Sequence, residues 1–193
     1  MLFRLLNMLL LGCALLASSS PSAAAQPGAP AFDLKVEHVD GSEGAKVYQI
    51  ASSGTVVASR AAVWRVLTDY DHLAEFLPNL KSARVVSRSG DKVVVEQLGT
   101  ARFLFFSQTI RLRVQVQESS PDRIDISLID GDMKVFRASW ELKPVPGAGG
   151  TRVVYNATIA PKFDVPGIVG TGVVRKDIGR MMGAVLQRAE RQE

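Results

Sequence analysis

The stretch Ile110-Arg111-Leu112-Arg113-Val114-Gln115-Val116-Gln117 places an apolar side chain at every second position and a polar one in between. Successive side chains of a strand point to opposite faces of a sheet, so this alternation predicts a strand with one buried face and one face in water. The same parity returns in residues 124–128 and 136–142, where the even-numbered side chains are again apolar. We therefore expect three strands that share one apolar face of an antiparallel sheet.

Further strands and two short helices are predicted on either side of these three. Ser59 is the expected N-cap of a short helix, and a second short helix over 73–77 should end at Pro78. Turn residues such as Ser89-Gly90-Asp91 separate the strands. The remaining strands are predicted over residues 45–58, 83–88, 93–106 and 153–159.

The C-terminal segment, from Asp164 to about Ala189, predicts a long helix, because apolar residues recur there at steps of three and four. Five glycines in this segment lower its intrinsic helix propensity, by about 1 kcal/mol each relative to alanine. Packing across a sheet would compensate, and it would cover the apolar face of the strands. The expected class is thus α+β: a curved antiparallel sheet of about seven strands around one long C-terminal helix, with two short helices after the first strand.

Composition excludes several kinds of site. Among 193 residues Cys13 is the only cysteine, and His38 and His72 are the only histidines. A disulfide framework, a thiolate metal site and a histidine-rich metal centre are therefore not expected, and no motif indicates a cofactor or a catalytic residue. The formal net charge is only +4, which gives no indication of a nucleic-acid partner and leaves a transient contact with an anionic membrane surface open.

The N-terminus has the pattern of a secretory signal peptide. Arg4 is followed by an apolar run, and Ala23-Ala24-Ala25 provides small residues for cleavage after Ala25. The alternative is a lipoprotein signal, because Leu10-Leu11-Gly12-Cys13 resembles a lipobox; acylation at Cys13 would anchor the chain to a membrane. We expect a signal peptide over 1–25, a flexible linker over 26–44, one domain over 45–193, and a periplasmic or secreted location.

Several motifs together resemble the helix-grip fold of START-like proteins, in particular the branch of polyketide cyclases/dehydrases and coenzyme Q-binding proteins. The resemblance rests on Val57-Ala58-Ser59 leading into residues 63–71, on Glu75-Phe76-Leu77-Pro78, on Gly131-Asp132 with Phe136 and Trp140-Glu141-Leu142 after it, and on residues 150–155. It covers about Ala45 to Ala189. It implies a deep apolar cavity between the sheet and the last helix, in which family members bind lipids, quinones, polyketides, sterols or plant hormones.

The candidate ligand-binding residues are those expected to face that space from the sheet and the helix. From the residues alone, an ordinary packed core is the alternative to a cavity. Tyr155 and Gln97 share the parity of their apolar neighbours and are the polar groups expected to orient a ligand. The full set comprises Gln97, Phe103, Phe105, Ile110, Leu112, Val114, Ile126, Leu128, Phe136, Trp140, Tyr155, Val173, Met181 and Met182.

Three functions stay open on the sequence. The first is an exported, non-enzymatic protein that holds or carries a hydrophobic small molecule. The second is an enzyme, a cyclase or dehydratase acting on a polyketide-like substrate, with Tyr155 and Gln97 as its only credible inward polar groups. The third is an interaction protein whose interior is filled. The sequence indicates no oligomeric state.

Overall fold

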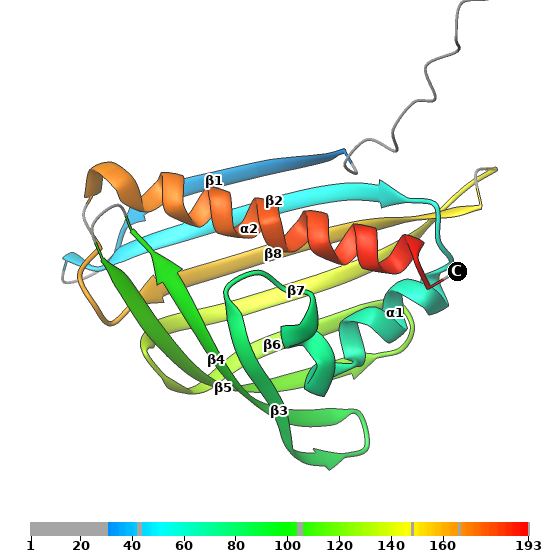
Figure 1. Cartoon of the computed structure of the whole chain (residues 1–193), viewed down its shortest axis with the longest axis horizontal. Coiled ribbons are helices and arrows are strands. Elements are labelled where there is room, and N and C mark those ends of the chain that lie inside the picture. Colours follow the sequence, from blue (N-terminus) through cyan, green and yellow to red (C-terminus); the bar gives the residue numbers. More distant parts are fainter. Residues whose placement is uncertain (1–30, 42–43, 104–105, 148, 166, 193) are drawn as a thin grey trace, which may run out of the picture.

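The computed structural model describes residues 31–192, except 42–43, 104–105, 148 and 166; the expected signal peptide and Cys13 lie outside the described residues. Eight antiparallel strands form one curved sheet in the order β1-β2-β8-β7-β6-β5-β4-β3, and helix α2 crosses its concave face (Figure 1). The elements are β1 Phe32–Asp40, β2 Lys46–Val56, α1 Arg60–Thr68, the 3-10 helix η2 Tyr70–Glu75, β3 Leu80–Ser89, β4 Lys92–Arg102, β5 Ser107–Ser119, β6 Arg123–Gly131, β7 Met133–Val145, β8 Gly150–Pro161 and α2 Gly167–Glu190. None of the helices described here is long and apolar enough to cross a membrane.

The predicted fold class is confirmed, with one more strand than expected. The additional strand, β1, lies within residues 26–44, for which a flexible linker was expected, so that expectation is wrong for Phe32–Asp40. β1 pairs with β2 along its whole length, from Phe32 opposite Gly54 to Asp40 opposite Lys46. The physical reason is its apolar face, since Phe32, Leu34 and Val36 belong to the core or pack against it.

The two short helices follow β2, as predicted. Ser59 caps α1, with its Oγ accepting a hydrogen bond from the backbone N–H of Ala62 at 3.2 Å. The second element differs from the prediction: it is a 3-10 helix over Tyr70–Glu75 rather than a helix over 73–77. The chain turns after it through Asn79, whose φ of 68° is left-handed, and enters β3.

The expected parity of the central strands is also present. Over residues 110–116, 124–126 and 136–142 the even-numbered side chains lie on the α2 side of the sheet; Val114, Ile124 and Trp140, for example, are buried. At the start of β7 a register shift places the odd-numbered Met133 in the cavity wall instead. Helix α2 approaches the sheet closely at Gly170, where a Cβ would lie 2.9 Å from Val165 Cγ1 and would overlap the Tyr48 hydroxyl. A glycine at this position lets the first turn of α2 rest on β2.

Candidate ligand-binding cavity

A cavity of about 280 Å³ lies between the concave face of the sheet, helix α2 and the η2–β3 connection. Its wall is predominantly apolar, with a small number of polar side chains. The lining consists of Leu67, Tyr70, Leu73, Leu77, Pro78, Asn79, Leu80, Gln97, Gly99, Thr100, Ala101, Ile110, Leu112, Val114, Val116, Ile124, Ile126, Met133, Phe136, Trp140, Tyr155, Asp177, Ile178, Met181 and Val185. The space under α2 is therefore not filled by side chains, in contrast to an ordinary packed core.

Most of the predicted ligand-binding residues line this cavity, because the sheet parity on which they were chosen is present in the fold. Those that do are Gln97, Ile110, Leu112, Val114, Ile126, Phe136, Trp140, Tyr155 and Met181. Whether they contact a ligand stays a prediction.

The other predicted residues lie elsewhere. Met182 is fully buried in the core, because the next residue of a helix points about 100° away from Met181. Leu128 and Val173 are half-buried and are not part of the cavity wall. Phe103 follows the end of β4, where a strand had been expected to continue, and its ring stacks on that of Phe106 with centroids 4.6 Å apart. Phe105 lies outside the described residues.

Tyr155, on β8, is one of the polar groups that the sheet contributes to the cavity wall. The side chain is 4% exposed, and its ring packs against Trp140 with centroids 4.5 Å apart. Within the described residues the Tyr155 hydroxyl has no hydrogen-bond partner. Burial raises the pKa of this phenol above its ordinary value, so the hydroxyl stays protonated.

A second set of polar groups lies where α2 meets the η2–β3 connection. Asn79 Nδ2 donates a hydrogen bond to Asp177 Oδ1 at 2.9 Å, across 98 residues of sequence. The backbone carbonyl of Asn79 accepts from the N–H of Thr100 at 2.8 Å, which fixes the loop on β4. Burial raises the pKa of the Asp177 carboxyl, while nearby Arg180 and the Asn79 hydrogen bond oppose that rise.

Sequence analysis missed Asp177, and with it the carboxylate of the cavity wall. Asp177 follows Arg175 and Lys176 in a polar run of the predicted helix, where an acidic side chain normally faces water. Its neighbour Ile178 does belong to the apolar stripe, and the lining includes both. The helical pattern therefore gave little indication that Asp177 lines the cavity. Its surroundings depend on the Asn79 loop, which is distant in the sequence.

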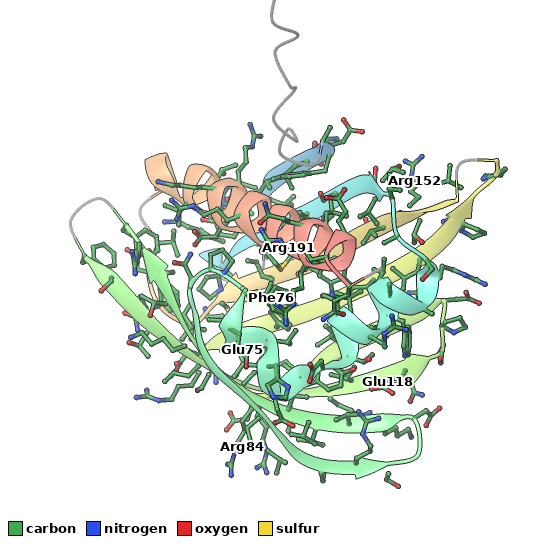
Figure 2. The ribbon with its side chains drawn as sticks, turned by 45° about the vertical axis from the view of Figure 1, so that its right-hand side comes forward. Glu75, Phe76, Arg84, Glu118, Arg152 and Arg191 are labelled. Atoms are coloured by element: carbon green, nitrogen blue, oxygen red, sulfur yellow. The ribbon has the colours of Figure 1, made fainter. Side chains whose placement is uncertain are left out.

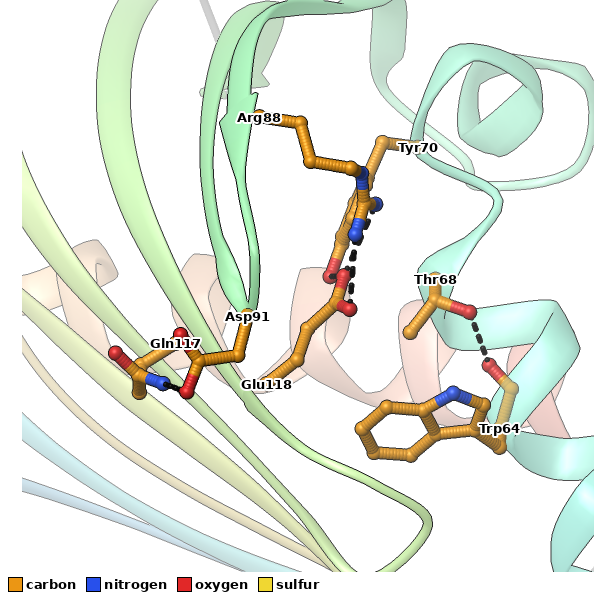
Figure 3. A network of polar contacts seen from close by, with 7 residues as sticks. All are labelled: Trp64, Thr68, Tyr70, Arg88, Asp91, Gln117 and Glu118. Atoms are coloured by element: carbon orange, nitrogen blue, oxygen red, sulfur yellow. Dashed lines mark hydrogen bonds and ion pairs between the residues drawn. The ribbon is translucent and has the colours of Figure 1, made fainter.

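The η2 wall of the cavity is fixed to the sheet by a polar cluster (Figure 3). The Tyr70 hydroxyl donates to Glu118 Oε1 at 2.9 Å, and Arg88 donates to both carboxylate oxygens of Glu118 at 3.0 and 3.1 Å. Burial, followed by the hydrogen bond to Glu118, raises the pKa of Tyr70 far above its ordinary value. The cluster joins η2, β3 and β5, and Tyr70 itself lines the cavity.

The same wall also contacts the helix. Figure 2 shows Phe76, just after η2, between that segment and α2, and the Arg188 guanidinium of α2 lies 5.6 Å from the centre of the Phe76 ring. Together with the bond between Asn79 and Asp177, this contact holds the η2–β3 connection against α2. An opening of the cavity at this side would have to break both contacts.

Two further depressions lie on the outer face of the sheet, with volumes of about 510 and 480 Å³. Their linings are mainly solvent-facing polar and charged side chains, such as Gln115, Arg137 and Asn156 in one and Arg111 and Glu96 in the other. They are larger and also more open and more polar than the cavity. A small-molecule site is usually enclosed and apolar with few polar groups, so the cavity under α2 is the better candidate.

A curved sheet that wraps one helix, with an apolar cavity between them, defines the class: a helix-grip protein. The chain belongs to the polyketide cyclase/dehydrase and lipid transport family, whose model matches residues 56–186. The expected START-like relationship is therefore confirmed. No curated protein matches the chain.

Solved structures with the same fold include both binding proteins and enzymes. A START superfamily protein from Mycobacterium smegmatis superposes with a TM-score of 0.65 at 16% identity, covering 75% of this chain and 99% of that one. The Zhui aromatase/cyclase from Streptomyces sp. R1128 gives 0.59 at 17% identity, with 75% and 94% covered. A STAR-related lipid transfer protein from Xanthomonas axonopodis gives 0.58 at 15% identity, with 80% and 98% covered. At these identities the likeness shows the fold alone.

Proposed function

We propose that this protein is an exported carrier that holds one hydrophobic small molecule, of lipid, quinone or polyketide type, in the cavity under α2. The observation that carries the proposal is the apolar cavity itself, with only a few polar groups in its wall. Binding would be driven by removal of apolar surface from water, at about 25 cal/mol per Å². The volume of about 280 Å³ is at the lower end of the range for small-molecule sites. That size favours a compact ring system or a single chain over a two-chain lipid.

The test is direct detection of a ligand. Native mass spectrometry of the purified protein, with extraction by organic solvent, should find a bound apolar molecule, or added apolar probes should raise the Tm. Leu112→Trp would fill the cavity from β5 and should abolish both signals. Ile129→Trp, on a side chain that is 49% exposed, is the matched control and should retain them. Absence of any ligand and of any Tm shift in the wild-type protein would contradict the proposal.

Export is proposed on the N-terminal sequence. Cleavage after Ala25 would leave a mature chain with a net charge of +3, from 22 Lys and Arg against 19 Asp and Glu, and with no cysteine. Expression of the full chain in a Gram-negative host, followed by N-terminal sequencing of the periplasmic fraction, should give Gln26 as the first residue. A chain that is instead acylated at Cys13 would be found in the membrane fraction, and Cys13→Ser would release it.

We also propose that ligand exchange involves a transient contact with an anionic membrane surface. Phe106, 46% exposed, forms a stacked pair with Phe103 just after the end of β4, and the cationic side chains of Arg102, Lys176 and Arg180 all act on Asp177 at the cavity wall. An exposed aromatic side chain, together with cations at the cavity wall, suits an anionic bilayer. Binding to vesicles that contain phosphatidylglycerol should fall in Phe106→Ser and not in Val57→Ser, a control on another exposed apolar side chain. Equal binding by both variants would contradict this contact.

One observation favours the enzymatic alternative. Asp177 supplies the cavity wall with a carboxylate, whereas the sequence had indicated only Tyr155 and Gln97 as inward polar groups. A carboxylate whose pKa is raised by burial can accept a proton from a substrate carbon next to a carbonyl group. Cyclase or dehydratase activity on a poly-β-ketone substrate that is lost in Asp177→Asn would favour this alternative; activity that survives the change would remove this version of it.

A further inference from the structure

Two polar groups of the cavity wall, which also includes Asn79, Gln97 and Thr100, are of opposite kinds. Tyr155, on β8, carries a hydroxyl that is a donor without a partner, and Asp177, on α2, carries a carboxylate that is only partly used as an acceptor. The two residues come from the sheet and from the helix, on different sides of the same cavity. A ligand that satisfies both must present complementary groups to each.

Tyr155 calls for a hydrogen-bond acceptor on the ligand. Its side chain is 4% exposed, and within the described residues the structure gives its hydroxyl no acceptor. The ring is held by Trp140, so the hydroxyl cannot swing out to water without moving a packed aromatic pair. The hydroxyl opens into the cavity, so a ligand that covers it without offering an acceptor would leave it unsatisfied, at a free-energy cost that an uncharged acceptor oxygen such as a carbonyl would avoid.

Asp177 calls for a hydrogen-bond donor. Asn79 Nδ2 donates to its Oδ1, whereas Oδ2 has no hydrogen bond or ion pair with any residue that the structure describes. Asn79 is itself held, through its carbonyl, by the backbone N–H of Thr100. The carboxylate is therefore positioned before a ligand arrives, and a free oxygen remains for a hydroxyl on the ligand.

We propose that Tyr155 and Asp177 orient the ligand, and that the ligand is an apolar hydroxy-carbonyl compound whose carbonyl oxygen accepts from Tyr155 and whose hydroxyl donates to Asp177. This inference rests on the proposed ligand-binding function and adds the ligand class and its direction in the cavity. It disfavours simple hydrocarbons, which leave both residues unsatisfied. Neither residue is assigned a catalytic step.

The test uses three matched probes: naphthalene, 2-acetylnaphthalene and 2-naphthol. Their affinities for the mature protein are measured by quenching of tryptophan emission, since Trp140 lines the cavity. 2-Acetylnaphthalene and 2-naphthol should each bind more tightly than naphthalene. Tyr155→Phe should weaken 2-acetylnaphthalene by about two- to tenfold, the range of one hydrogen bond, and leave naphthalene unchanged. Asp177→Asn should weaken 2-naphthol in the same way and leave naphthalene unchanged.

Matched controls separate an orienting role from a structural one. Tyr48→Phe changes a buried tyrosine outside the cavity wall, and Asp130→Asn changes an exposed aspartate; neither should alter any of the three affinities. If naphthalene binds and the two cavity variants weaken all three probes equally, the orienting pair is wrong while the carrier function stands. If none of the probes binds the wild-type protein, the carrier function itself is contradicted, and the inference with it.

Discussion

Glu118 connects three elements through its carboxylate, although its side chain is only 13% exposed. Replacement by glutamine removes the charge that holds Arg88 and leaves one acceptor oxygen for the Tyr70 hydroxyl and the Arg88 guanidinium to share. We expect Glu118→Gln to lower the free energy of unfolding by about 1–3 kcal/mol, because hydrogen bonds to a poorly solvated charge are lost. Urea unfolding of a chain that begins at Gln26 measures this.

The control for this prediction is Glu96→Gln, which weakens solvent-exposed ion pairs with Arg84 and Arg113. Glu96 Oε2 accepts from Arg84 at 2.7 Å, with side chains 41% and 71% exposed, and an exposed pair contributes at most about 1 kcal/mol. A loss in Glu118→Gln that is no greater than that in Glu96→Gln would show that the cluster does not stabilise the η2 wall.

His72 should respond to pH through Asp69. The hydrogen bond between His72 Nδ1 and Asp69 Oδ1, 2.6 Å long, is the main cause that raises the pKa of His72 above 6.5. The protonated form is therefore favoured by folding; its contribution to stability is fully present below pH 6.5 and is lost as pH rises through the folded-state pKa. NMR titration should give His72 a pKa above the 6.5 of an unperturbed histidine, and the Asp69→Asn change should lower the pKa of His72. An unchanged titration in Asp69→Asn would contradict the pairing.

At the cavity, most residues of the sheet could be predicted from the sequence, whereas on α2 the pattern identified Met181 but not Asp177. Tyr155 was found because a strand fixes its parity by local alternation alone. Met182 was assigned wrongly to the cavity wall, since a helix can be turned by a fraction of a residue step without changing its pattern. Asp177 was missed because its position depends on Asn79, which lies 98 residues earlier.

In α2, two glycines only two residues apart differ in the space that surrounds them. At Gly170 an added Cβ would overlap the hydroxyl of Tyr48, which is 1% exposed and cannot move aside, whereas at Gly172 nothing lies within 4 Å of that position. Gly170→Ala should therefore destabilise the protein, by about 1–3 kcal/mol for an overpacked contact. Gly172→Ala should instead stabilise it, by up to about 1 kcal/mol, through helix propensity.

Thermal or urea unfolding of the two variants side by side checks the close approach of α2 to β2. Since both changes add the same methyl group to the same helix, propensity alone predicts that both stabilise. A stabilised Gly170→Ala protein would show that the first turn of α2 does not rest on Tyr48.

The strands β5 and β1 show which strands an alternating sequence pattern can predict and which it cannot. The alternation of β5 is clear over eight residues, and the structure has it as predicted. β1 has a similar alternation from Phe32 to Glu37, but it follows a segment rich in proline, glycine and alanine, and its second half is polar and exposed. Its partner β2 supplies the hydrogen bonds that make it a strand, and that pairing is tertiary information.

For the molecule as a whole, β1 protects one of the two edges of the sheet. Deletion of residues 26–40 would expose the edge of β2 and remove the buried Val36 side chain, whose burial alone contributes about 1.5–3 kcal/mol. We expect this variant to lose at least about 2 kcal/mol of stability and to self-associate in size-exclusion chromatography. Deletion of 26–30 alone, which leaves β1 intact, should have neither effect. A monomeric and equally stable 26–40 deletion would contradict this role of β1.

The neighbouring pair β2–β8 has a consequence for the time course of folding. β2 pairs on one side with β1 and on the other with β8, from Tyr48 opposite Ile159 to Val56 opposite Thr151. A chain emerging from a ribosome or a translocation channel can form the β1–β2 hairpin at once. The other edge of β2 stays unpaired until β8, about a hundred residues later in the sequence, has been made. Closing so long a loop is slow compared with local pairing. The nascent chain thus passes through a period with an unpaired edge, in which a holding chaperone would find its binding site.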